Sequence, residues 1–367
     1  MLRKFFTTTI VFASFNVLFA QDSTKTFAIS GSIDAFYRYN FSNPKSGTNN
    51  FTSFTNAHNS FELGMATLRA DGSALSGKVT GTADLGFGRR AEEFSYADGQ
   101  LNTASGYSDL RFPLDSPYVS GKNGFLTLAA VKQLYVTYTP GKYVKFTIGK
   151  WATHVGYELL DAYANRNYSM DYMFSYGPFS HTGLKLEYAQ GTTGFMIGIA
   201  NPTDNATTTS TAKTLLAQFS VGSKNGAFKA YLNYQGSFSS LNKFNQVDLV
   251  LLGTVSPMFN IGYNGTIFAY KGSNNSWMGS ALYFNFDPTP AVGLTLRGEY
   301  LGNKNYVLPL GTKNIFDVTF SVDCKVGPLT IIPELRFKSA QSGIYTKHDG
   351  NNAKGTAAGL LAAIYKF

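Results

Sequence analysis

The chain ends in the stretch TAAGLLAAIYKF, residues 356–367. Counting back by twos from its end gives only apolar, aromatic or small residues: Phe367, Tyr365, Ala363, Leu361 and Gly359. Successive side chains of a strand point to opposite faces, so this spacing gives one apolar face. That face suits lipid, and the aromatic residues suit the boundary between membrane and water. The stretch alone predicts either the closing strand of a membrane β-barrel, paired with residues 27–41, or an apolar strand of a soluble protein.

The composition favours a membrane protein rich in β-structure. Of 367 residues, 15% are aromatic, with 31 Phe and 23 Tyr, and Gly contributes 37. Phe and Tyr favour the pleated surface of a sheet, and Gly permits turns. Charged residues make up only 14% of the chain, against roughly 25% in soluble domains. This deficit indicates that much of the outer surface contacts lipid.

Charge and cysteine content exclude two classes of function. The formal net charge is +9, but no Lys/Arg run is longer than Arg89-Arg90. Scattered basic residues of this kind do not indicate a nucleic-acid-binding surface. Cys324 is the only cysteine, so the chain can form no internal disulfide and no thiolate metal cluster.

The first twenty residues predict a secretory signal peptide. Arg3 and Lys4 precede an apolar run that ends at Ala20, before a polar shift at Gln21. A membrane anchor is the alternative, but the run is short and polar residues interrupt it. No later apolar run approaches the ~20 residues that a spanning helix needs. We therefore expect residues 1–20 to direct export and residues 21–367 to form the mature domain.

The pattern from residue 26 onward is dyadic and predicts about sixteen strands. Short turns such as 139–142, 190–193 and 223–226 alternate with longer polar loops such as 152–180. A soluble sandwich also alternates in hydropathy, but it has no reason to alternate its connection lengths. Short turns on one side and long loops on the other are typical of outer-membrane barrels. The expected strands are 26–41, 57–70, 77–89, 125–139, 142–151, 181–190, 193–201, 212–222, 226–235, 243–255, 259–270, 276–286, 291–301, 312–325, 328–338 and 354–367.

The polar phase of these strands predicts a charged lumen. A barrel of about sixteen strands is wide enough for an aqueous channel, and inward charges tune its ion preference. The residues expected to line the pore are Arg38, Lys78, Asp84, Lys145, Lys185, Glu187, Arg297, Glu299, Glu334 and Arg336.

The loop 152–180 is the candidate constriction, because loops this long are usually functional. We expect it to fold into the lumen, with its charged residues facing basic wall residues such as Arg38, Lys78 or Arg297. The alternatives are a mobile external loop, or a constriction made by loop 90–124 with its flanking Arg89. The charged residues of the first candidate are Glu158, Asp161, Arg166 and Asp171; those of the second are Arg89, Arg90, Glu92, Glu93 and Arg111.

The sequence offers no pattern typical of an enzyme or a cofactor protein. Its four histidines lie in separate loops or loop ends without metal-ligand spacing, and no nucleophile elbow or phosphate loop is present. Only His181, with Ser175 or Ser180 nearby, suggests a hydrolase, and it is better explained as a loop-to-strand turn. We expect no catalytic residue, no metal and no cofactor.

Several segments resemble the OmpL-like β-barrel porins of Gram-negative outer membranes. The resemblance rests on GSIDAFYRYNF (31–41), HNSFELGMA (58–66), ADLGFGRRAEEF (83–94), VKQLYVTYTPGK (131–142), GKWATHVGYE (149–158) and FSYGPFSHTGLKLEYA (174–189). It implies a porin-type barrel and passive transport, and it assigns no substrate or site residue.

The sequence therefore predicts an all-β transmembrane barrel of the outer membrane that passes small hydrophilic solutes or ions by diffusion. Its expected partners are the lipid bilayer and those solutes, with either a monomer or a homotrimer as the assembly. Three alternatives remain: a barrel transporter for a hydrophobic solute, an outer-membrane enzyme, and a soluble exported β-protein.

Overall fold

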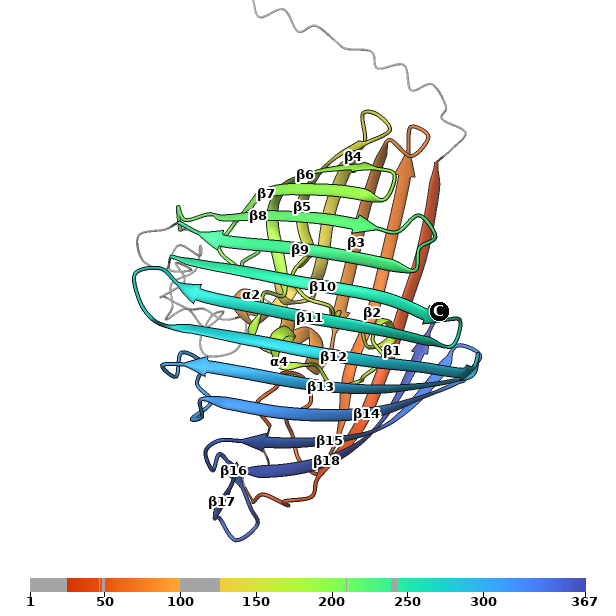
Figure 1. Ribbon diagram of the computed structural model, residues 1–367. Helices are drawn as coiled ribbons and strands as arrows, with labels where there is room; N and C mark the ends of the chain where they lie inside the picture. The colour runs from red at the N-terminus through yellow and green to blue at the C-terminus, as the bar shows by residue number, and fades with distance from the viewer. Residues whose placement is uncertain (1–24, 46, 48–49, 100–125, 209, 239–242) are drawn as a thin grey trace, which may run out of the picture.

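Sixteen antiparallel strands form one closed barrel in the computed structural model (Figure 1). The structure describes residues 25–45, 47, 50–99, 126–208, 210–238 and 243–367. The expected signal peptide lies outside these residues. The barrel strands are β1 Thr26–Asn40, β2 Ser60–Ala74, β3 Val79–Phe87, β4 Val131–Tyr138, β5 Val144–Ala152, β6 Ser180–Gln190, β7 Thr193–Ala200, β8 Thr214–Gly222, β9 Phe228–Ser237, β10 Phe244–Ser256, β11 Phe259–Tyr270, β12 Ser276–Thr289, β13 Val292–Lys304, β14 Asn314–Val326, β15 Leu329–Ala340 and β18 Gly355–Lys366.

The terminal stretch closes the barrel, as its spacing predicted. Strand β18 pairs with β15 on one side and with β1 on the other, with Ile33 opposite Tyr365. Gly31 and Phe367 exchange two backbone hydrogen bonds of 3.0 Å each at the end of this seam. Closure leaves the barrel without an edge strand, so every barrel strand has a neighbour on both sides.

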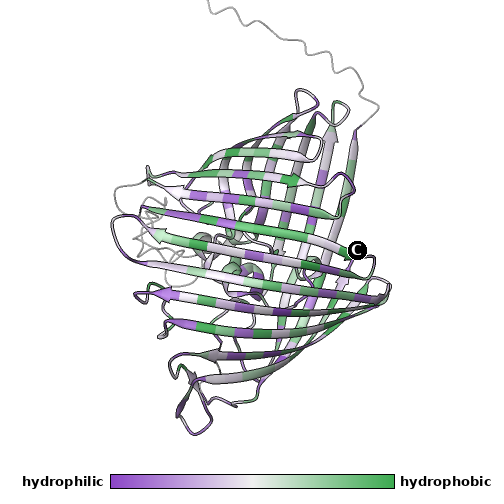
Figure 2. Ribbon diagram, in the orientation of Figure 1, coloured by the Kyte–Doolittle hydropathy of each residue, from purple (hydrophilic) through white to green (hydrophobic). Residues whose placement is uncertain are grey.

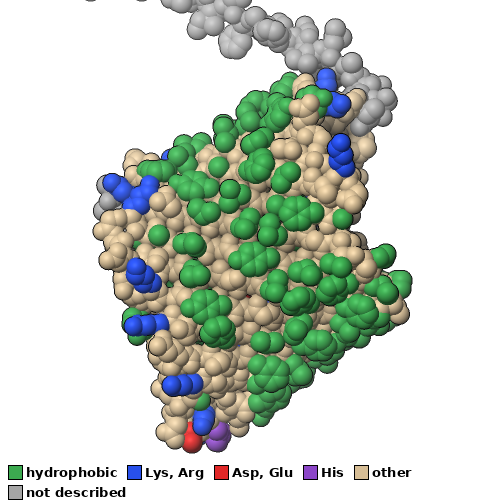
Figure 3. Space-filling model, in the orientation of Figure 1, with side chains coloured by type: hydrophobic (Ala, Val, Ile, Leu, Met, Phe, Trp, Pro, Cys, Tyr) green, Lys and Arg blue, Asp and Glu red, His purple; other side chains and the backbone are tan. Residues whose placement is uncertain are grey.

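The two faces of the sheet differ in polarity, which is visible as alternating colours along the strands in Figure 2. Outward positions such as Ile33, Ile267 and Phe337 are apolar and more than half exposed. Inward positions such as Arg297 and Asp317 are charged and buried inside the barrel. Figure 3 shows the apolar side chains gathered over the outer wall. An apolar exterior and a polar interior are what a lipid-embedded, water-filled barrel requires.

The connections keep the predicted order of short turns and long loops. One set of turns, each of two to five residues, lies at the end of the barrel that holds the first residue of β1 and the last residue of β18, which by the general rule is the periplasmic side. The connection 271–275 at the other end is an exception, because it is as short as these turns. The opposite, extracellular loops are called L1 to L8: 41–59, 88–130, 153–179, 201–213, 238–243, 271–275, 305–313 and 341–354. None of the helices in the described part of the chain is long and apolar enough to cross a membrane.

Some elements differ from the expectation. Strand β4 begins at Val131 rather than at residue 125, because Leu126–Ala129 form the short helix α3. Leu and Ala are good helix formers, but the alternation Leu126-Thr127-Leu128 also fits the period of a strand. Strand β2 is Ser60–Ala74 and thus extends past the predicted 57–70. Helices α1 Arg89–Phe94 and α2 Tyr96–Gly99 lie in L2, and the hairpin of β16 Tyr345–Thr346 and β17 Asn352–Ala353 lies in L8.

Replacing Gly31 by valine should weaken the pairing of β1 with both of its neighbours, β2 and the closing strand β18. The added Cβ would lie 2.4 Å from the Thr67 carbonyl oxygen and 2.6 Å from the Phe367 ring, and overpacking of this kind costs about 1–3 kcal/mol. We expect the folded band of this variant on semi-native gels to disappear at a lower temperature than that of the wild type. Gly72→Val is the matched control, because nothing lies within 4 Å of a Cβ at Gly72. Equal melting of the two variants would contradict the assigned seam.

Candidate pore and constriction site

Loop L3 leaves β5 and enters the lumen, where it carries the 3-10 helix η3 Ala162–Ala164 and helix α4 Tyr172–Tyr176 (Figure 1). Its first residues bind β9 and β10, four to five strands further around the barrel. The ring Nε2 of His154 donates to the Tyr234 carbonyl oxygen at 3.1 Å, and the Gly156 amide donates to Asp248 Oδ1 at 3.0 Å. Burial lowers the pKa of His154 to about 4, so this ring is neutral at pH 7. The beginning of L3 is therefore fixed to β9 and β10.

A buried cluster of charges fixes the middle of L3 to β12 and β13. Arg297 Nη1 of β13 donates to Glu158 Oε1 of L3 at 2.5 Å, and the Arg297 side chain has no exposed surface. The Asp171 amide donates to the other oxygen of Glu158 at 2.7 Å, and the Tyr283 hydroxyl donates to Asp171 Oδ2 at 2.9 Å. Burial raises the pKa of the Asp171 carboxyl well above its usual range, and the negative charges of Glu158 and Glu299 raise it further.

A second anchor lies over β14 and β15. The Tyr168 amide donates to Glu334 Oε2 at 2.9 Å. Arg336 donates from Nη1 to the Met170 carbonyl oxygen at 2.8 Å and from Nε to Asp317 Oδ2 at 2.6 Å. Glu334 and Arg336 each bind L3 on one side and a wall residue, Ser321 or Asp317, on the other. The inner wall of β13 to β15 is therefore buried beneath L3.

Two further ion pairs fix L3 on other sides of the lumen. Asp161 Oδ1 lies 2.6 Å from Lys132 Nζ of β4, which also lies 3.1 Å from Asp84 Oδ1 of β3. Arg166 donates through both Nη atoms to the carboxylate of Asp287 near the periplasmic end of β12, at 2.6 and 2.5 Å. L3 thus spans the barrel in several directions and is not a free external loop.

Loops L1 and L2 pack against L3 inside the barrel. Arg90 of α1 is buried and donates to the carbonyl oxygens of Leu160 and Tyr168 at 3.0 and 3.2 Å. Its guanidinium lies 5.5 Å from the ring centroid of Phe54 in L1 and 4.8 Å from that of Tyr168. The described start of loop 90–124 therefore supports L3, whereas Arg111 lies outside the described residues.

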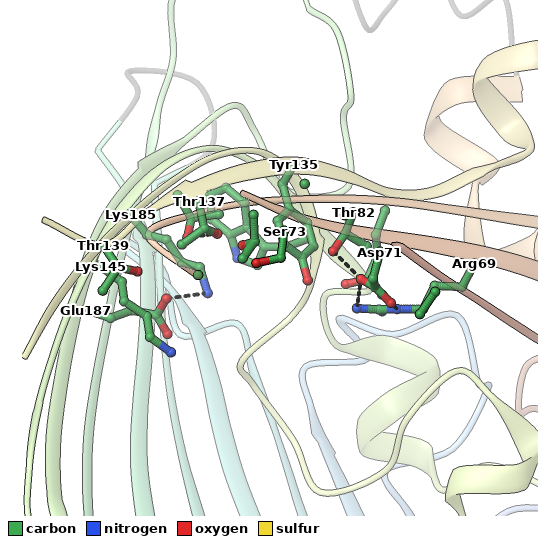
Figure 4. A pocket seen from close by; sticks show the side chains of 18 of the residues that line it. Arg69, Asp71, Ser73, Thr82, Tyr135, Thr137, Thr139, Lys145, Lys185 and Glu187 are labelled. Carbon is green, nitrogen blue, oxygen red and sulfur yellow. Dashed lines mark hydrogen bonds and ion pairs between the residues drawn. The ribbon is translucent and has the colours of Figure 1, made fainter. Parts of the chain in front are cut away.

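A cavity of about 630 Å³ lies on one side of the lumen and is lined by the inner wall of β1 to β6 (Figure 4). Arg69 Nε and Asp71 Oδ2 of β2 form an ion pair of 2.7 Å, and Thr82 donates to the same carboxylate. On the opposite side, Lys185 Nζ and Glu187 Oε2 of β6 lie 3.3 Å apart. Threonine and serine hydroxyls and Tyr135 lie between the two pairs (Figure 4). The cavity lining thus carries hydroxyl and charged groups beside some apolar surface, and it is nearly balanced in charge.

The predicted pore residues fall into three groups. Lys145, Lys185 and Glu187 line the open cavity. A second group faces the interior but is buried beneath the loops: Arg38, Asp84, Arg297, Glu299, Glu334 and Arg336. Lys78 lies instead in the exposed turn between β2 and β3. Of the basic residues expected opposite L3, Arg297 contacts it directly, whereas Arg38 donates to the Ala57 carbonyl oxygen of L1.

The period-two pattern of the sequence did not identify some residues of the site, because their roles depend on irregular strand pairing or on contacts between distant residues. Lys132 faces the interior because the register between β3 and β4 shifts after Asp84. Tyr283 looks like any aromatic strand residue until its hydroxyl is seen between two carboxylates. Arg69 lies within the expected strand 57–70 and Asp71 lies one residue beyond it, and neither was among the residues expected to line the pore. The His181 ring contacts the Thr153 hydroxyl at 3.0 Å rather than a serine. Within the described ranges, no group of three metal-ligating side chains comes together.

The fold and this site define a porin-type barrel, a class of membrane channel with a polar lumen narrowed by an inward loop. The family model described as "Putative beta-barrel porin-2, OmpL-like" matches residues 26–367, and the chain belongs to this family.

Solved structures with the same fold include three bacterial outer-membrane proteins. The outer membrane channel DcaP of Acinetobacter baumannii is 13% identical, with 94% of this chain and 97% of that chain covered and a TM-score of 0.58. The anion-selective porin from Comamonas acidovorans is 12% identical, with 94% and 100% covered and a TM-score of 0.56. OmpT of Vibrio cholerae, in its trimer form, is 14% identical, with 94% and 99% covered and a TM-score of 0.54. A comparison with curated protein sequences gives no match.

Asp204 of L4 predicts a pH dependence of stability. Its carboxylate accepts hydrogen bonds from the Phe179 amide, the Ser180 amide and the Tyr96 hydroxyl, so it joins L2, L3 and L4. Burial raises its pKa from 3.8 to about 6. Because the folded protein holds this proton more tightly, its stabilising contribution is full below about pH 4 and is lost as the pH rises through about 6.

Between pH 7 and pH 4 we therefore expect wild type to gain on the order of 3 kcal/mol relative to Asp204→Asn. Thermal unfolding of both proteins at several pH values measures this difference. A difference that does not change with pH would contradict the buried, proton-binding carboxyl.

Proposed function

We propose that this porin-family protein resides in the outer membrane and passes small hydrophilic solutes or ions by diffusion along one side of its lumen. One observation carries the proposal. The inner walls of β2 to β6 line an open polar cavity, whereas the inner walls of β13 to β15 are buried under L3. The cavity-lining residues of β2 to β6 are thus available to solvent and solute, whereas the buried residues of β13 to β15, together with Lys132 of β4, hold the constriction.

The lining of the cavity suits hydrated solutes rather than an apolar cargo. Hydroxyl groups supply donors and acceptors that replace lost contacts with water. The charged lining residues are three cations, Arg69, Lys145 and Lys185, and two anions, Asp71 and Glu187. Of these, Lys145 is exposed and has no carboxylate within 4.0 Å in the described chain. This polar surface argues against transport of a hydrophobic solute.

Loop L3 supports a fixed constriction. Glu158, Asp171 and Arg297 lie together in a buried cluster, and breaking such a pair from one side typically costs about 3–5 kcal/mol. A loop held this firmly narrows the lumen permanently instead of swinging in and out. The lumen width is then set by structure, as passive size-limited diffusion requires.

One chain carries all the contacts of this pore. The seam, the constriction and the cavity are built from a single barrel. We therefore propose that each chain has its own channel, either as a monomer or within a trimer such as that of the Vibrio cholerae protein. Diffusion needs no catalytic group and no cofactor, and we propose neither.

Deleting residues 158–171 should increase the single-channel conductance in planar bilayers, because this segment carries the anchors that hold L3 across the lumen. The control shortens the exposed L8 hairpin by deleting residues 348–350, which lie outside the barrel wall, and should leave the conductance unchanged. An unchanged conductance after the L3 deletion would contradict L3 as the constriction.

Reversing two charges of the cavity should shift ion selectivity towards cations. In the double variant Lys145→Glu and Lys185→Glu, the lining changes from a net positive to a net negative charge. The reversal potential in asymmetric KCl measures the shift. The double variant Lys142→Glu and Lys224→Glu changes the total charge equally, but in exposed periplasmic turns, and should shift it much less. Equal shifts would place the solute path elsewhere.

A further inference from the structure

The extracellular rim of the barrel carries a row of lysines along the strands from β8 to β18. Seven exposed lysines lie at or next to the extracellular ends of the strands from β8 to β18: Lys213, Lys243, Lys271, Lys304, Lys313, Lys347 and Lys354. Among the described residues from 210 onward, Asp349 is the only exposed acidic residue. Figure 3 shows blue side chains along this rim and a single red one. The rim is therefore strongly positive over half of the circumference.

Four of these lysines are in register with the lipid-facing side of the wall. Lys304 lies on β13, and Lys213, Lys243 and Lys271 directly adjoin β8, β10 and β11; each lies an even number of residues from an outward apolar or aromatic position of that strand. These positions are the exposed Leu215, Val247 and Ile267 for Lys213, Lys243 and Lys271, and the half-buried Tyr300 for Lys304. The four lysines thus lie just above the apolar belt, at the depth where lipid headgroups meet the protein. We call them the rim lysines.

Two rim lysines lie directly opposite each other. The pairing of Phe244 with Tyr270 continues outward by one residue, and the Lys271 amide donates to the Lys243 carbonyl oxygen at 2.8 Å. Like charges opposite each other across a ladder destabilise a sheet unless an anion lies between them. In the described chain, no salt bridge joins a rim lysine to a carboxylate. Lys271 instead lies 3.8 Å from the ring centroid of Phe238, an aromatic residue of the rim.

We propose that the rim lysines bind the phosphate groups of outer-leaflet glycolipids. Lysine is a common phosphate ligand, and clusters of lysines next to a membrane-embedded surface attract anionic headgroups. A phosphorylated glycolipid fits both the rim lysines and the apolar belt below them. Its phosphates contact the lysines while its acyl chains cover the belt. A free phosphate ion would contact only the lysines. This inference rests on the outer-membrane location proposed above.

The position of the lysine pair also explains why the site needs a lipid rather than a protein carboxylate. Val247 and Ile267 are the nearest strongly exposed outward residues beneath Lys243 and Lys271, so acyl chains occupy the space next to the pair. An anion at this level must tolerate a hydrocarbon neighbour on one side and water on the other. A phosphorylated headgroup does so, since it is covalently attached to the chains that fill that space.

The test compares binding of diphosphorylated lipid A to the purified full-length protein in detergent, measured by native mass spectrometry. We expect the variant with Lys213, Lys243, Lys271 and Lys304 all changed to Gln to bind at least about tenfold more weakly. The control changes four lysines of the periplasmic side to Gln: Lys78, Lys142, Lys224 and Lys325. It removes the same charge and should bind within about twofold of wild type.

Three outcomes would overturn the proposal. The rim variant binds as tightly as wild type; the control loses as much affinity, which would indicate a general charge effect; or inorganic phosphate competes as well as the lipid, which would indicate a site for the free ion. Dephosphorylated lipid A should bind the wild type and the rim variant equally. If the fourfold variant folds poorly, the pair Lys243→Gln and Lys271→Gln repeats the comparison.

Two readouts separate this inference from the porin function. Without lipid, Lys243→Gln should melt no lower than wild type, because it removes one of two like charges on opposite residues; added lipid A should stabilise this variant less than it stabilises the wild type. Single-channel conductance of the rim variant should equal that of wild type. A wild type that binds lipid A but does not conduct would refute the pore and leave the lipid site standing.

Discussion

Backbone pairing is the constraint on which the structure depends. In hydrocarbon no water can satisfy an open N–H or C=O group, so a sheet that crosses a bilayer must close on itself. The pairing of β1 with β18 meets this requirement, and the exchange between Gly31 and Phe367 completes it at the chain end. Closure then forces alternate side chains into an interior that lipid cannot reach. A charged lumen is the direct consequence.

Buried charge explains the arrangement within that lumen. Arg297 and Arg336 would be costly inside a narrow, partly dry barrel without acidic partners, and L3 supplies Glu158 while the wall supplies Asp317 and Glu299. The densest group of these contacts holds the loop over β13 to β15, and further ion pairs join it to Lys132 of β4 and Asp287 of β12. The wall of β2 to β6 that lines the cavity carries mainly hydroxyl groups and partly exposed ion pairs, and L3 does not cover it. One asymmetry in the wall therefore decides both the constriction and the path.

The sequence determined much of the fold because membrane barrels have few degrees of freedom. The period-two hydropathy pattern and the alternation of turn and loop lengths predicted about sixteen strands. They also predicted that residues 27–41 pair with the end of the chain. Helix α3 was not predicted, because four residues are too few to show a helical period. The bulge in the pairing of β3 with β4 near Asp84 was not predicted, because one extra residue reverses which side chains face inward without changing the composition of the strand.

The candidate site was predictable only in part. Loop length indicated L3, and the inward phase indicated Lys145, Lys185 and Arg297. The contact between Glu158 and Arg297 joins residues 139 positions apart, and no local pattern encodes which of several inward cations a loop carboxylate will meet. The role of Arg90 as the support of three loops likewise depends on packing that the sequence pattern does not contain.

The central claim is that solutes pass along β2 to β6 and not along β13 to β15. Thiol-reactive blocking of single cysteines in planar bilayers tests it most directly, in a Cys324→Ala background. Thr137→Cys, in the wall of the open cavity, should react with a charged methanethiosulfonate and reduce the current. Thr319→Cys, fully buried beneath L3, should not react. Block at position 319 without block at position 137 would contradict the account.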